Sequence, residues 1–133
     1  MFSAQFFATW SPRMLAILRI AVALIFLEHG TQKLFGFPAS PRPTTFDLTT
    51  LPTISALIEL IGGALLLVGF QTRLVAFIVS GEMAFAYFIA HHPRNLFPVL
   101  NGGDAAILYC FVFLYLCFAG PGTWSLDTHR RPA

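Results

Sequence analysis

Long apolar runs alternate along the chain with short segments rich in proline, glycine and charged residues. At about 1.5 Å per residue, a helix of 18 or 19 residues reaches about 27–29 Å, close to the thickness of the hydrocarbon core of a bilayer. The pattern therefore predicts an all-α integral membrane protein, a four-helix bundle that forms one domain. The four predicted spans, each 18 or 19 residues long, are 13–30, 53–70, 73–91 and 103–120.

The connections between the runs predict how the chain crosses the membrane. Three prolines exclude a helix from the segment after Gly36, and Gly120-Pro121-Gly122 ends the last run. Four crossings would place both chain ends and the loop between the second and third spans on one side. Because that side carries more basic residues, we predict that both termini are cytoplasmic. The basic residues on that side are Arg13, Arg73, Arg130 and Arg131, against Lys33, Arg42 and Arg94 on the other.

Composition supports the membrane interpretation and excludes other classes. Hydrophobic residues make up 56% of the chain and charged residues 11%, with a mean hydropathy of +0.73, whereas soluble domains carry about a quarter charged residues. A net charge of +2 without a strong basic cluster excludes a typical nucleic-acid-binding protein. Cys110 and Cys117 lie about 10 Å apart along one predicted helix, too far for a disulfide. We expect a multi-pass protein of the cell membrane, surrounded by lipid.

Ionisable residues inside the runs are the candidates for function. A charge at the centre of a bilayer costs several kcal/mol, so such residues usually face the interior of a bundle. Counting along the predicted helices places the acids and histidines from mid-membrane towards the non-cytoplasmic side. We predict a polar ligand site there, formed by Arg19, His29, Lys33, Glu59, Glu82, His91 and Asp104.

Helical periodicity indicates which faces of the predicted helices are buried. Arg19, His29 and Lys33 fall on one face, which we expect to point into the bundle. Glu28 falls on the opposite face, near the interface or a partner. Glu59 shares its face with small residues, which let helices approach closely in lipid. We therefore expect Glu59 and Glu82 to point into the bundle, within reach of Arg19, of His29 or of each other.

Each candidate also has a structural interpretation. Arg19 could form an ion pair with Glu59 or Glu82 that only holds helices together. Asp104 could stabilise the N-terminus of its helix, and Lys33 could extend its amine to the membrane interface. His91, followed by His92-Pro93, could simply be a polar helix end.

Four elements lie in order along the chain: His29-Gly30-Thr31-Gln32-Lys33-Leu34-Phe35-Gly36, Glu59-Leu60-Ile61-Gly62-Gly63 with Gly69, Asn101-Gly102-Gly103-Asp104 with Leu108-Tyr109, and Gly120-Pro121-Gly122 with Ser125-Leu126-Asp127. Together they resemble the DoxX family. The resemblance covers most of residues 13–127. One position departs from the family, which commonly has Glu where this chain has Asp104. The resemblance implies a four-helix bundle in the bacterial inner membrane. The related DoxD protein is the membrane subunit of a thiosulfate:quinone oxidoreductase, and other relatives are linked to oxidative-stress responses through partner proteins.

Two hypotheses of different classes follow. In the first, the chain is a redox-associated membrane subunit, and so part of an oxidoreductase, that binds a quinone or another small ligand and works with a redox partner protein. No nucleotide, haem or paired-cysteine motif occurs, and without a Glu-x-x-His pair a di-iron centre is not expected. In the second, it is a non-catalytic scaffold or a small-solute transporter that acts through partner proteins. A quinone retained by the purified protein would favour the first.

Overall fold

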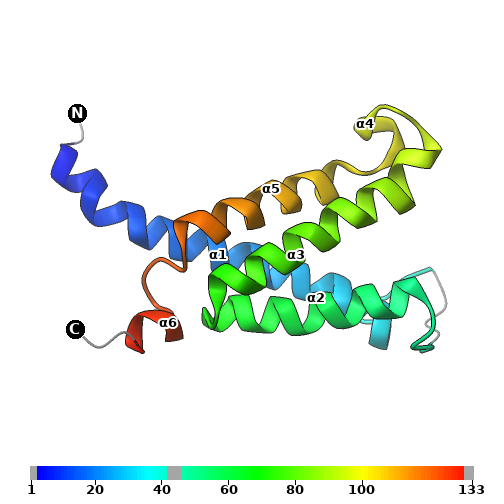
Figure 1. Cartoon of the computed structure of the whole chain (residues 1–133), viewed down its shortest axis with the longest axis horizontal. Coiled ribbons are helices and arrows are strands. Elements are labelled where there is room, and N and C mark those ends of the chain that lie inside the picture. Colours follow the sequence, from blue (N-terminus) through cyan, green and yellow to red (C-terminus); the bar gives the residue numbers. More distant parts are fainter. Residues whose placement is uncertain (1–2, 42–45, 131–133) are drawn as a thin grey trace.

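The computed structural model describes residues 3–41 and 46–130, and this part of the chain is helical without a strand. The long helices of this part run back and forth, so that the start of the first helix and the last short helix lie at the same end of the molecule (Figure 1). The long helices are α1 (Ala4–Phe35), α2 (Leu51–Val68), α3 (Thr72–Ala86) and α5 (Asp104–Ala119). The short ones are η1 (Tyr87–His91), η2 (His92–Arg94), α4 (Pro98–Asn101) and α6 (Leu126–His129).

The helix ends follow local sequence signals. Ser3 caps α1 by accepting a hydrogen bond from the backbone N–H of Phe6 at 3.1 Å. Gly36 and Gly69 end α1 and α2 with φ of 67°, the left-handed conformation that glycine adopts without strain. The main departure from expectation is α1, which has 32 residues instead of the predicted 18, because its helix begins at Ala4, continues through Pro12 and ends at Phe35.

The membrane architecture is confirmed in its broad form. Within the described residues, three helices are long and apolar enough to cross a membrane: α1, α2 and the continuous helical segment Thr72–Arg94. α5 is also apolar but has only 16 residues. Arg42 and Arg131, which entered the orientation argument, lie outside the described residues.

The bundle consists of two closely packed antiparallel pairs, α1 with α2 and α3 with α5. Gly30 allows the first contact, because a Cβ there would lie 2.8 Å from the backbone nitrogen of Leu60. Large side chains such as Phe26 and Phe113, whose ring centroids are 4.8 Å apart, fill the space between the pairs. The small-residue face predicted for α2 is buried against protein, as expected: Gly63 packs on α1 and Gly62 on Val79 of α3.

Candidate functional site

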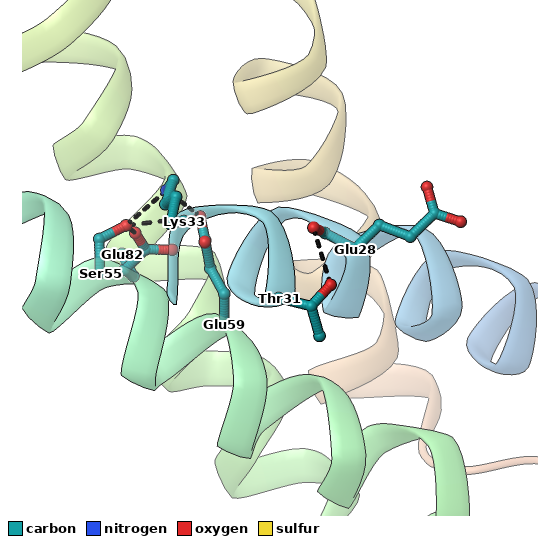
Figure 2. A network of polar contacts seen from close by, with 6 residues as sticks. All are labelled: Glu28, Thr31, Lys33, Ser55, Glu59 and Glu82. Atoms are coloured by element: carbon teal, nitrogen blue, oxygen red, sulfur yellow. Dashed lines mark hydrogen bonds and ion pairs between the residues drawn. The ribbon is translucent and has the colours of Figure 1, made fainter. Parts of the chain in front are cut away.

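A polar cluster joins three helices near the C-terminal end of α1 (Figure 2). Lys33 comes from the last turn of α1, Ser55 and Glu59 from one face of α2, and Glu82 from α3. The ammonium of Lys33 lies 2.6 Å from Oε1 of Glu59 and donates to Oγ of Ser55 at 3.0 Å. The Ser55 hydroxyl donates to Oε1 of Glu82 at 2.7 Å. We call these four residues the Lys33 cluster.

The two carboxylates of the Lys33 cluster are not fully satisfied by protein groups. Glu59 is 2% exposed, and within the described chain the buried Oε2 atoms of both Glu59 and Glu82 have no hydrogen-bond partner. One ammonium faces two carboxyl groups, and buried charge without a partner is costly. Each carboxyl group therefore keeps one oxygen whose capacity to accept a hydrogen bond or a proton is unused.

A cavity of about 950 Å³ contains this cluster. It is partly open, and the Lys33 side chain, 38% exposed, lies at its boundary. Most of its lining is apolar, which is typical of small-molecule sites with a few polar groups that fix orientation. The apolar lining includes Ile54, Ile58, Ile78, Met83, Phe85 and Ile89.

The structure brings five of the seven predicted site residues to this one cavity. Besides Lys33, Glu59 and Glu82, its lining includes His29 and His91. The ring of His29 stands edge-on to that of Tyr109, with centroids 5.9 Å apart. Nδ1 of His91 lies 3.2 Å from the carbonyl oxygen of Asn101. Both histidines thus have defined positions at the cavity.

Arg19 lies elsewhere, and the expectation that it pairs with Glu59 or Glu82 is wrong. It is fully buried near the other end of the bundle, and all five guanidinium N–H groups donate to backbone carbonyls. Arg19 and Lys33 do share a helix face, but 14 residues of helix separate them by about 21 Å. The accepting carbonyls belong to Leu66, Leu67, Pro121, Thr123 and Trp124.

The remaining acids also lie outside the cavity. Asp104 is exposed in the first turn of α5, where a carboxylate stabilises the helix N-terminus, and it is not among the lining residues. Glu28 points away from the Lys33 cluster, as its helical angle predicted (Figure 2). Lys33 does more than reach the interface, because its amine pairs with Glu59.

Four polar lining residues were missed as candidates: Gln32, Ser55, Arg94 and Tyr109. Ser55 lies one helical turn before Glu59, so the sequence indicates that the two share a helix face. Its hydrogen bond to Glu82, however, depends on the position of α3. Arg94 lies beyond the predicted end of the third span. Among the residues that the structure describes, no group of three His, Cys, Asp or Glu side chains is arranged to hold a metal ion.

Comparison with known proteins gives a consistent result. The family model described as DoxX matches residues 14–92. A Haemophilus influenzae protein named only as uncharacterized is 43% identical over 89% of this chain and 91% of its own length. The inner membrane protein YphA of Escherichia coli is 29% identical over 91% of this chain and 93% of its own length. An uncharacterized membrane protein of Mycobacterium tuberculosis is 26% identical over 87% of this chain and 80% of its own length. No solved structure matches the chain significantly.

Proposed function

Because this chain belongs to the DoxX family of inner-membrane proteins, we propose a function inside the bilayer: it binds a lipid-soluble ligand of the quinone type as the membrane subunit of a redox system. One observation carries the proposal. Two carboxylates, each with one buried oxygen that lacks a protein partner, line a large, mostly apolar cavity between membrane helices.

The Lys33 cluster has the groups that a quinone headgroup needs. A quinone carbonyl accepts hydrogen bonds, and the ammonium of Lys33 and the ring of His29 can donate them. A quinol has two hydroxyl donors, and the Oε2 atoms of Glu59 and Glu82 are acceptors without a partner. The same cluster can therefore hold both redox forms, and its carboxylates can accept the protons that a quinol releases.

The rest of the cavity suits the remainder of such a ligand. Its apolar side chains provide a surface for an isoprenoid tail, and its volume of about 950 Å³ lies at the upper end of the range for small-molecule pockets. Electrons would come from or pass to a partner protein, as the resemblance to the DoxD subunit suggested. The chain's own residues would bind the headgroup, orient it and exchange protons with it.

The proposal includes a topology. We propose that α5 crosses the membrane beside the three longer spans, completing a four-helix bundle with both termini cytoplasmic. The cavity would then face the non-cytoplasmic side. Reporter fusions at Ser40 and Ala133 test this, and we expect an external signal at Ser40 only. External activity at Ala133 would contradict the orientation, and signals from the same side at both positions would contradict four crossings.

Ligand binding can be tested with the purified protein in lipid nanodiscs. We would titrate a short-chain ubiquinone analogue against wild type, Lys33→Ala and Glu59→Gln, and identify by mass spectrometry any lipid-soluble molecule that co-purifies. Lys33→Ala should lower the affinity at least tenfold, because it removes the donor at the headgroup. Glu59→Gln keeps the shape but not the proton acceptor, so it should impair turnover more than binding.

Glu28→Gln is the matched control, because it makes the same chemical change on α1 outside the cavity, and it should bind like wild type. Thermal melting must be measured in parallel. The Lys33 cluster also links α1, α2 and α3, which is the observation that favours the alternative of a non-catalytic scaffold or transporter. If the cavity variants lose ligand only in proportion to stability, the quinone proposal fails and the scaffold remains.

A further inference from the structure

Glu28 is a carboxylate on the outer surface of α1, away from the cavity. It interrupts an exposed apolar stripe on that helix, with Leu24 and Ile25 beside it 48% and 50% exposed. Within the part of the chain that the structure describes, its side chain has no hydrogen bond or ion pair. The polar site therefore does not account for this acid.

Helix packing sets the depth of Glu28 in the bilayer. Its neighbour Leu27 packs at the position of Gly63, and Gly30, two residues further along, packs on Ala56 and Leu60. Glu28 thus lies level with the middle of α2, an apolar helix of 18 residues that is long enough to cross a membrane. Half of that helix is about 14 Å, so the carboxylate lies near the centre of the hydrocarbon core.

A carboxylate at this depth needs a partner. An exposed acidic side chain there costs several kcal/mol unless a cation or hydrogen-bond donor reaches it, and among the described residues no side chain forms a hydrogen bond or ion pair with this carboxylate. We propose that the outer face of α1 around Glu28 docks a transmembrane helix of a different protein, one that carries an arginine or lysine at mid-bilayer depth. The exposed leucine and isoleucine beside Glu28 would pack against the apolar part of that helix.

A second copy of this chain fits the face less well. In a twofold dimer the same patches meet, so two Glu28 carboxylates would face each other. Among the described residues, the cations are either engaged or near the ends of the bundle. Lys33 pairs with Glu59, and Arg19 has all five donors satisfied. The cation that pairs with Glu28 must therefore come from another protein.

The proposal can be tested without knowing that protein. The full chain, labelled with a donor fluorophore, is reconstituted in phosphatidylcholine vesicles with a synthetic Leu/Ala transmembrane peptide that carries an acceptor. The peptide has Arg at its centre, or Leu in the control. We expect the Arg peptide to associate with wild type at least tenfold more tightly than the Leu peptide does, and Glu28→Leu to abolish the difference. Glu28→Gln keeps the side-chain size but removes the charge, so this variant should lose most of the preference for the Arg peptide.

Three results would overturn the proposal. In the first, wild type binds both peptides equally. In the second, the preference for Arg persists in Glu28→Leu and Glu28→Gln. In the third, wild type forms a dimer that Glu28→Leu disrupts, which would make a second copy the occupant. The ubiquinone affinity of the Glu28 variants should equal that of wild type. Failure of this proposal is therefore distinct from failure of the cavity proposal.

Discussion

Replacing Arg19 with lysine tests how much its five hydrogen bonds stabilise the bundle. The guanidinium is fully buried and joins α1 to the end of α2 and to the segment after α5. Four of the five donor–acceptor distances lie between 2.7 and 2.9 Å, and the fifth is 3.3 Å. Lysine keeps the charge but has three donors instead of five. At least two of the five carbonyls must therefore lose their partner.

The magnitude follows from those two carbonyls. A buried carbonyl left without a hydrogen bond costs about 1–3 kcal/mol. Four of the five hydrogen bonds are only partly buried, and the carbonyl of Leu66 also accepts from the N–H of Gly69, so the lower part of that range applies. We expect Arg19→Lys to lower the free energy of unfolding by about 2–4 kcal/mol. Quinone binding should be unchanged in the folded protein, because Arg19 lies outside the cavity.

Equilibrium unfolding in mixed micelles, followed by circular dichroism, measures this change. Arg73→Lys is the matched control, because Arg73 is exposed and uses one nitrogen, Nη1, to reach the carbonyls of Cys117 and Phe118. A lysine amine can replace both bonds, so the control should lose less than about 1 kcal/mol. If Arg19→Lys unfolds within about 0.5 kcal/mol of wild type, the hydrogen bonds do not stabilise the bundle as argued.

Two further predictions concern helix packing and capping. Gly30→Ala would place a Cβ 2.8 Å from the backbone nitrogen of Leu60, so α1 and α2 must separate, and we expect a loss of about 1–3 kcal/mol in the same unfolding assay. In Gly81→Ala the added Cβ meets no atom within 4 Å, so this variant should be as stable as wild type or up to about 1 kcal/mol more stable. Equal losses of stability in the two variants would contradict the packing argument. Asp127 accepts hydrogen bonds at 2.8 Å from the backbone N–H groups of Gln71, just before α3, and of Thr72, its first residue, so Asp127→Ala should cost about 1–2 kcal/mol. Hydrogen exchange at the start of α3 should speed up, and unchanged exchange there would rule out this capping role.

The sequence by itself determined the secondary structure and the environment of this protein. Apolar runs of 18 or 19 residues predict helices of membrane-spanning length, and the ends of α2 and α5 fall within two residues of the prediction. The inward orientation of Glu59 was also predictable, because small residues on the same face indicate a close helix contact. These features depend on composition and periodicity over a single segment, which a sequence displays directly.

Tertiary structure alone decided which polar side chains meet. Periodicity placed Arg19 and Lys33 on one face of α1, but an angle around a helix does not specify the depth or the neighbour that a side chain reaches. Pairing of α1 with α2 brings Lys33 to Glu59, whereas Arg19 meets the carbonyls at the end of α2 and in the segment after α5. The bridge from Ser55 to Glu82 requires α3 beside α2. Such contacts join residues far apart in the chain, and their partners depend on how whole helices pack.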